Sequence, residues 1–171
     1  MTLDHEVGVR LPHGQLWRGT LLRQFYYLKN KGTMIRKVID LWNERKGILQ
    51  KAIECTDMAD VSYCELVKLI AIHIIGIKEE DLVLVECATD DYQGCNGYMF
   101  CEKRSSCYDF YTTIAYYGSC SGCDAIMGIT GYETGMPDSG QVKDFLDVCL
   151  DIVQKIKQPY NPDVKEMEAD V

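Results

Sequence analysis

Residues 82–117, LVLVECATDDYQGCNGYMFCEKRSSCYDFYTTIAYY, decide the fold. Three runs within them, Leu82–Ala88, Gly97–Cys101 and Asp109–Tyr117, are rich in β-branched or aromatic residues, and turn-forming residues separate them. Such runs are typical of strands, because branched and aromatic side chains pack well on a pleated surface. Since the three runs follow one another directly, we predict an antiparallel meander.

Helical patterns precede and follow the strand region in the sequence. A periodic apolar face begins at Met34, and a second helix is predicted from Ser62, whose capping box with Glu65 marks its start, to Gly76, a natural helix end. The last helix follows a capping signal at residues 138–141 and is the most regular element. We therefore predict an α+β fold in which a short antiparallel sheet of three strands, or slightly more, packs with three helices in the order α-α-β-β-β-α.

The patterns also divide the chain. Residues 1–33 show no sustained period and contain turn chemistry at 11–14 and 29–32, so we interpret them as an N-terminal appendage. Residues 34–158 form the predicted single domain, and residues 159–171, which begin with a proline, form a polar tail. His73, inside the apolar second helix, is predicted to be a core residue.

Composition narrows the class of protein. The chain has 171 residues, a net charge of −8 and nine cysteines, an odd number that favours free thiols in a reducing compartment. No basic region followed by an apolar run opens the sequence, so a cytoplasmic location is expected. The longest apolar stretch, 66–77, is interrupted by Lys68 and His73 and is too short for a membrane span. The negative net charge and the lack of a Lys and Arg cluster argue against direct nucleic-acid binding. Mimicry of nucleic acid stays an alternative, although the acidic residues are dispersed and not laid out in a row.

Two segments beside the strands have unusual glycine and polar content. They are Asp90–Gly94 and Tyr116–Asp124, the second of which reads YYGSCSGCD. Glycines permit close backbone approach, and the serines add hydroxyls for a polar ligand. Whether the two segments meet at one edge of the sheet or lie at opposite ends is left open.

The second segment admits several interpretations. It is either a tight turn with small buried thiols, in which Asp124 caps backbone amides, or a loop that contacts a ligand. Cys120 and Cys123 also have the spacing of zinc knuckles, but a zinc site needs four ligands, and Cys95, Cys101 and Cys107 would have to supply the others. A redox dithiol is a further alternative, although Gly128 and Gly131 leave little room for the helix that usually follows such a pair. Hydrolysis by a cysteine would need a histidine base, for which the predicted domain offers His73 alone.

The same residues carry a family resemblance. The Tyr92–Gly94 turn, the Tyr117–Asp124 loop and a long helix that starts near Gln141 resemble an uncharacterised family of small proteins found in phages and prophages of Gram-positive bacteria. The similar region runs from about Leu41 to Lys157, and residues 1–33 have no counterpart. The resemblance implies a phage or prophage accessory protein, such as an inhibitor of a host defence system or a protein that sequesters a small signalling molecule.

This chain departs from the family pattern at a few positions. Cys95 follows the YQG turn where the family has threonine, and residues 125–127 read Ala-Ile-Met instead of Thr-Leu-Gln. Cys95, Cys101 and Cys107 are not part of the pattern, which weakens the four-cysteine zinc alternative. The loop itself is intact.

We therefore predict a non-enzymatic protein that binds a small polar ligand or a host protein, with no catalytic residues and no cofactor. The runner-up is a CxxC metal or redox protein, in which Cys120 and Cys123 would hold zinc. The oligomeric state does not follow from the sequence. The predicted binding residues are Tyr92, Gln93, Gly94, Tyr117, Gly118, Ser119, Cys120, Ser121, Gly122, Cys123 and Asp124.

Overall fold

A computed structural model describes residues 20–88, 91–103, 110–131 and 133–157, with side chains described from residue 37 onward. The larger elements, in chain order, are α1 (Thr20–Glu54), α2 (Tyr63–Ile70), β1 (Leu82–Cys87), β2 (Gly94–Glu102), β3 (Tyr111–Tyr117), α3 (Ala125–Thr130) and α4 (Ser139–Gln154). Short helical turns lie at η1 (Met58–Asp60), η2 (Ala71–Ile75) and η3 (Glu79–Asp81). The predicted α+β class and element order are confirmed.

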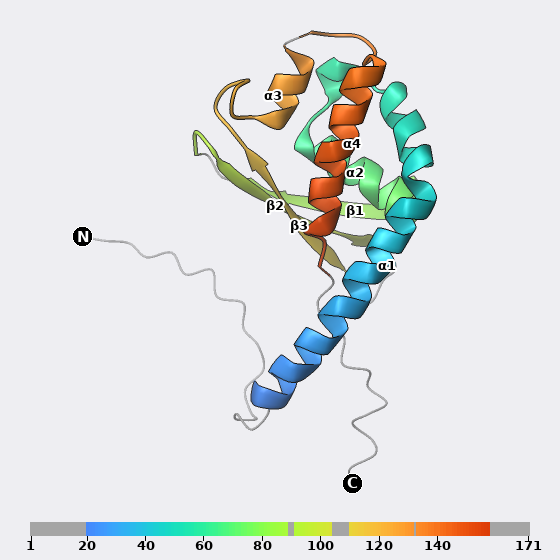
Figure 1. The fold of residues 1–171 in the computed structure, drawn as a ribbon, viewed down its shortest axis with the longest axis vertical. Coiled ribbons are helices and arrows are strands. Elements are labelled where there is room, and N and C mark those ends of the chain that lie inside the picture. Colours follow the sequence, from blue (N-terminus) through green and yellow to red (C-terminus); the bar gives the residue numbers. More distant parts are fainter. Residues whose placement is uncertain (1–19, 89–90, 104–109, 132, 158–171) are drawn as a thin grey trace, which may run out of the picture.

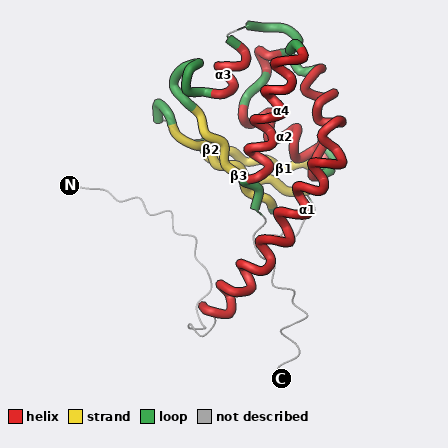
Figure 2. Tube along the Cα trace, in the orientation of Figure 1, coloured by secondary structure: helices red, strands yellow, loops and turns green. Residues whose placement is uncertain are grey.

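The three strands form one antiparallel meander in the order β1-β2-β3. Figures 1 and 2 show the helices gathered against the sheet, with α4 in contact with β3, and α1 packed on α4 and η2. Because a β-strand is pleated, successive side chains point to opposite faces of the sheet. Phe100 and Tyr98 point toward the helices and are buried, whereas Val83, Val85 and Met99 point to the other face and are exposed.

The core consists of apolar side chains from α1, α2, α4 and the inner face of the sheet, and the short α3 contributes Ile126. Phe100 of β2 and Phe145 of α4 have no exposed surface. At about 25 cal/mol per Å² of apolar area, burial of side chains this large is the dominant favourable term in folding. The fully buried set includes Phe100, Phe145, Leu49, Ile53, Leu66, Ile70, Ile74, Ile152, Val67 and Cys149.

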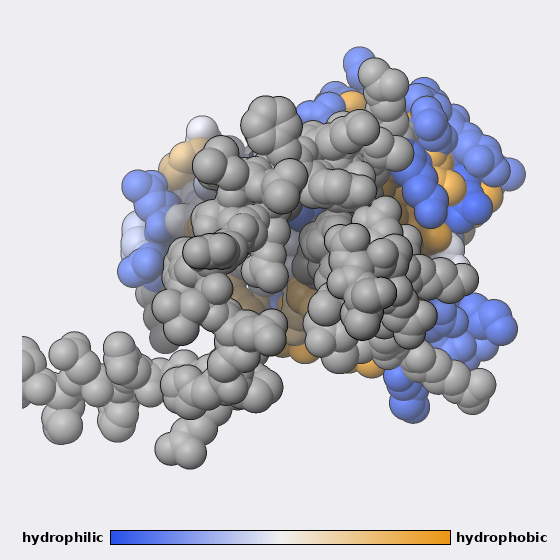
Figure 3. Space-filling view, turned by 90° about the horizontal axis from the view of Figure 1, so that it is seen from below, coloured by the Kyte–Doolittle hydropathy of each residue, from blue (hydrophilic) through white to orange (hydrophobic). Residues whose placement is uncertain are grey.

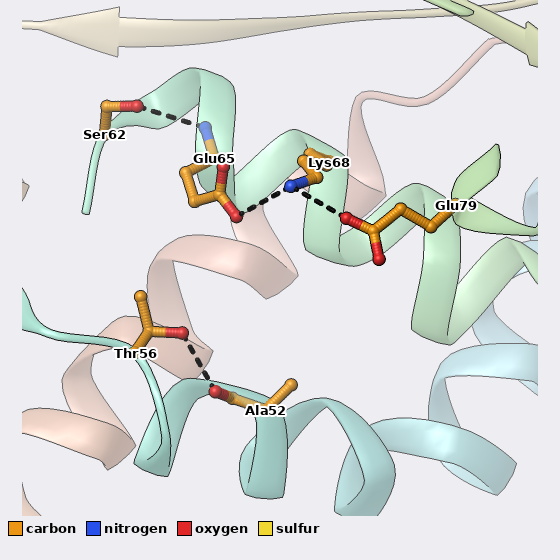
Figure 4. A network of polar contacts seen from close by, with 6 residues as sticks. All are labelled: Ala52, Thr56, Ser62, Glu65, Lys68 and Glu79. Carbon is orange, nitrogen blue, oxygen red and sulfur yellow. Dashed lines mark hydrogen bonds and ion pairs between the residues drawn. The ribbon is translucent and has the colours of Figure 1, made fainter. Parts of the chain in front are cut away.

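Helix boundaries follow local sequence signals. Ser62 Oγ accepts the backbone N–H of Glu65 at 3.1 Å, and the Glu65 carboxylate lies 3.5 Å from Lys68, which also reaches Glu79 (Figure 4). The hydrogen bond with Glu79 raises the pKa of Lys68. Gly76 ends the second helical segment in the left-handed region, at φ 93°, as its predicted role requires.

At α4 the capping box is complete. Asp138 accepts the N–H groups of Gly140 and Gln141, and the Gln141 side chain accepts the Asp138 N–H at 2.9 Å. The loop before this helix is joined to η1, because Asp57 accepts from Gly135 N and Gly135 O accepts from Met58 N. Asp57 also accepts the N–H of Ala59, and the hydrogen bonds from Ala59 and then Gly135 lower the pKa of Asp57.

Several predicted boundaries are wrong. Helix α1 begins at Thr20 instead of Met34 and passes through residues 29–32, which were expected to form a turn. The short helix α3 was not predicted, because Gly128 and Gly131 were taken as helix breakers; Gly131 is its C-cap. β2 begins at Gly94, so Gly94 is a strand residue. His73 is half-buried in η2 instead of enclosed, and burial lowers its pKa.

Other predictions fall partly outside the described residues. Residues 1–19 of the appendage and residues 158–171, which include the whole polar tail, are not among them. The division into an appendage, a domain at 34–158 and a tail therefore stays a prediction. Within the described part, no helix combines the length and the apolar character needed to cross a bilayer. Where grey atoms leave the surface visible, Figure 3 shows mostly hydrophilic residues with smaller hydrophobic areas between them.

The first part of α1 should be dispensable for folding. In Figure 1 this part extends away from the sheet, and the first described core residue is Val38. A chain that starts at Met34 should unfold thermally within about 4 °C of the full chain, the shift that corresponds to about 1 kcal/mol at this size. Trp42→Ala, which removes a buried side chain of the same helix, should lower the unfolding free energy by about 3–5 kcal/mol. A loss on truncation as large as that of Trp42→Ala would contradict the boundary at residue 34.

Candidate functional site

The two glycine-containing segments lie side by side. Gly94, the first residue of β2, pairs with Tyr117, the last residue of β3, and the Tyr117 hydroxyl donates to the backbone oxygen of Asp91 at 2.9 Å. Figure 1 shows the β1–β2 connection next to the segment that leads from β3 to α3. The arrangement follows from the meander, because antiparallel strands alternate in direction and β3 therefore ends where the β1–β2 connection lies.

The side chains of Tyr92 and Gln93, at the end of the β1–β2 connection, face solvent. Tyr92 is 85% exposed and Gln93 is exposed as well. Asp90 lies outside the described residues. Aromatic residues are enriched at recognition surfaces, so an exposed tyrosine ring is typical of such a surface.

Asp124 organises the second segment from inside. Its side chain is buried, and one carboxylate oxygen accepts the N–H of Met127 at 2.8 Å as the N-cap of α3. The other oxygen accepts the N–H of Gly118 at 3.0 Å and the hydroxyl of Tyr63 at 3.4 Å. Burial and the neighbouring Asp124 charge raise the pKa of Tyr63 to about 12. The carboxylate thus ties the end of β3, α2 and α3 together, as the capping interpretation predicted.

Gly118 is required by close packing. A Cβ at this position would collide with the carbonyl group of Cys123 and would lie 2.7 Å from the Cys123 sulfur. The chain therefore turns back on itself tightly between Gly118 and Cys123. Within that turn, the Cys120 carbonyl accepts the N–H groups of both Cys123 and Asp124 at 2.9 and 2.8 Å.

The turn places two thiols together at the surface. The sulfurs of Cys120 and Cys123 are 3.0 Å apart and both residues are exposed. The Cys123 sulfur also accepts the backbone N–H groups of Ser119 at 3.1 Å and Cys120 at 3.2 Å. Hydrogen bonds from the Cys120 thiol and the Ser119 side chain, together with these amides, lower the pKa of Cys123. The interpretation of this segment as a turn with small buried thiols is therefore wrong as to their burial.

The remaining loop residues differ in how exposed they are. Ser119 is half-buried, with its hydroxyl 3.7 Å from the Cys123 sulfur, whereas Ser121 and Gly122 are exposed. Tyr117 is half-buried at the strand end. Ten of the predicted binding residues therefore gather at one end of the sheet, and the eleventh, Asp124, lies beneath them with its side chain inward.

A zinc site would need more ligands than this end of the sheet provides in the described residues. No group of three or more histidine, cysteine, aspartate or glutamate side chains in that part of the chain could hold a metal ion. Cys101 pairs with Val83 toward the opposite end of β1 and β2, so it is remote from the CxxC pair. Cys107 lies outside the described residues.

A polar cluster that sequence reasoning missed lies at the same end of the sheet. The Glu86 carboxylate accepts the Tyr98 hydroxyl at 2.7 Å and the Asn96 amide at 3.0 Å. Burial raises the pKa of Tyr98. The side-chain oxygen of Asn96 is buried and has no hydrogen-bond partner among the described residues. Register could have found part of this cluster, because Glu86 falls at an inward position of a predicted strand, where a polar residue needs a partner. Asn96 was missed because β2 begins at Gly94, three residues before the predicted strand.

Comparison of the chain with protein-family models, with curated protein sequences and with solved structures gave no match. The phage and prophage resemblance therefore stays a prediction.

Loss of the Asp124 carboxylate should destabilise the fold. Asp124→Ala removes the N-cap of α3 and leaves the Gly118 N–H without its acceptor, so the unfolding free energy should fall by about 2 kcal/mol in denaturant titration. Ser62→Ala, which removes a single capping hydrogen bond at α2, should cost about 1 kcal/mol and serves as the reference. An unchanged midpoint for Asp124→Ala would show that the carboxylate does not hold the loop.

Two glycines should respond oppositely to alanine. Gly118→Ala forces a methyl group into the Cys123 backbone and should cost about 2 kcal/mol or more. Gly47→Ala meets no atom within 4 Å and lies inside α1, so it should stabilise the protein by up to about 1 kcal/mol. Thermal unfolding of the two variants checks both signs, and a neutral Gly118→Ala would contradict the close packing.

Proposed function

We propose that this chain is a non-enzymatic binding protein whose recognition surface is built from the two adjacent turns. We call this surface the two-turn surface and define it by residues 91–93 and 119–123. The observation that supports it most is the Gly94–Tyr117 pairing, which brings both turns to one end of the sheet. Separate in sequence, the two segments offer a ligand one continuous set of exposed groups.

The chemistry of these groups suits recognition. Tyr92 supplies an exposed aromatic ring, Gln93 an amide, and Ser121 a hydroxyl. Tyrosine is frequent among the residues that carry binding energy, because a large ring is ordered at the loss of few rotamers. Amides and hydroxyls add directed hydrogen bonds. A polar small molecule or a polar patch of a partner protein satisfies such a surface.

The buried contacts beneath the surface support the same proposal. Asp124 and the tight approach of Gly118 to Cys123 fix the backbone of the second turn before any ligand arrives. A turn that is already ordered loses less conformational entropy on binding, so more of the contact energy remains as affinity. Asp124 therefore contributes by positioning the turn.

The resemblance to a phage and prophage family gives the proposal its biological setting. For an accessory protein of that kind, the partner is a host protein of a defence system or a small signalling molecule that such a system uses. The net charge of −8 disfavours nucleic acid as the direct ligand. A reducing host cytoplasm suits the free thiols.

Surface variants should separate binding from stability. Tyr92→Ala and Ser121→Ala remove exposed side chains and should change the unfolding free energy by no more than about 0.5 kcal/mol. Both should lose molecules that the native protein retains through purification and releases on denaturation, and both should lose protection of phage on defended host strains. Lys51→Ala, an exposed change in α1, is the matched control and should behave as wild type. If Tyr92→Ala and Ser121→Ala matched the control in both assays, the two-turn surface would not be the recognition surface.

A further inference from the structure

The CxxC pair carries a chemical capability that binding does not use. We propose that Cys120 and Cys123 form a thiol–disulfide exchange site that reduces an accessible disulfide and is itself converted to a Cys120–Cys123 disulfide. The inference rests on the geometry of the two thiols and is independent of what the two-turn surface binds. A small-molecule disulfide or an exposed disulfide of a partner protein is the substrate class.

The two sulfurs are already placed for a bond. They lie 3.0 Å apart, and a disulfide of about 2.05 Å requires them to approach by about 1 Å. Both cysteines are exposed, so a second disulfide can reach them.

The surroundings assign different roles to the two thiols. The Cys123 sulfur accepts backbone N–H groups from Ser119 and Cys120, and these donors stabilise a thiolate more than a thiol. Cys123 is therefore the attacking sulfur. The Cys120 sulfur, in direct contact with it, is the resolving sulfur.

The reaction balances in two exchanges. The Cys123 thiolate attacks one sulfur of a disulfide RSSR, forms a Cys123–SR bond and releases one RS⁻, which takes up a proton. Cys120 then loses its proton to solvent and attacks the Cys123 sulfur, forming the Cys120–Cys123 bond and releasing the second RS⁻, which is protonated in turn. Two electrons pass from the protein dithiol to RSSR, giving one protein disulfide and two RSH.

The other described cysteines lack this combination. Cys149 is fully buried, and burial raises its pKa to about 12. Burial also raises the pKa of half-buried Cys64, with Glu86 adding to the effect. Cys55, Cys87 and Cys95 are exposed, and no sulfur–sulfur contact joins any of them to another described cysteine. Cys55 and Cys87 serve as exposed internal references.

The test uses the full chain, fully reduced, freed of reductant and mixed with oxidised glutathione at pH 7. After an acid quench, alkylation and peptide mass spectrometry follow each cysteine with time. We expect the 120–123 disulfide to form at least tenfold faster than mixed disulfides form at Cys55 or Cys87, and dithiothreitol to reverse it. Equal rates at all exposed cysteines, or no 120–123 disulfide, would overturn the proposal.

Variants identify the roles. Cys120→Ser should stop at a stable glutathione adduct on Cys123, whereas Cys123→Ser should lose the fast reaction. Cys55→Ser should leave the rate unchanged. Circular dichroism checks that each variant folds, and the wild-type kinetics decide the proposal even if one does not. Fast attack retained in Cys123→Ser would overturn the assigned order. Retention of molecules through purification is measured separately from disulfide exchange, so failure of the binding proposal and failure of this one are distinguishable.

Discussion

The buried Asp124 carboxylate is the constraint on which the candidate site depends. It receives hydrogen bonds from Gly118 at the end of β3, from the first turn of α3 and from Tyr63 of α2, which lies 61 residues away in the sequence. A buried carboxylate is costly unless its oxygens are hydrogen-bonded, and here both are. Because the same residue accepts the N–H of Gly118, where the turn begins, it restrains the loop that carries the two thiols and the exposed serine. The loop is held from beneath, which leaves its upper side free.

Local signals in the sequence predicted most of the fold. Ser62, Gly76 and the Asp138–Gln141 pair marked helix ends correctly, because caps are satisfied by residues within one turn. The start of α1 was missed, since Gly32 is a weak helix former that the long helix nevertheless accommodates. Helix α3 was missed for a related reason. Its two glycines read as breakers, whereas Gly131 is the left-handed C-cap and Gly128 faces the Ser121 carbonyl, where a Cβ would come within 2.9 Å.

The site was predictable in part. Its residues were identified from glycine, serine and cysteine content, and the meander that was also predicted implies that both turns lie at one end of the sheet, a consequence that had been left open. The sequence could not tell whether these side chains point into the protein or toward solvent. The same aspartate can cap a turn or face a ligand, and a CxxC pair can be buried or exposed. Those choices depend on the 3.0 Å contact between the sulfurs and on where Gly118 meets Cys123, which only the folded backbone fixes.

The segment that follows α4 covers part of one edge of the sheet, and such cover limits self-association. Just past α4, Lys157 and Thr112 exchange two backbone hydrogen bonds of 2.7 Å, and the Lys155 ammonium lies 4.6 Å from the centre of the Tyr116 ring. These contacts lie along the outer edge of β3. A three-stranded sheet has two such edges, and an open edge is a template on which another chain can add a strand. The bridge closes part of the β3 edge, and among the described residues no bridge covers the outer edge of β1, which is therefore the more open of the two edges to an added strand.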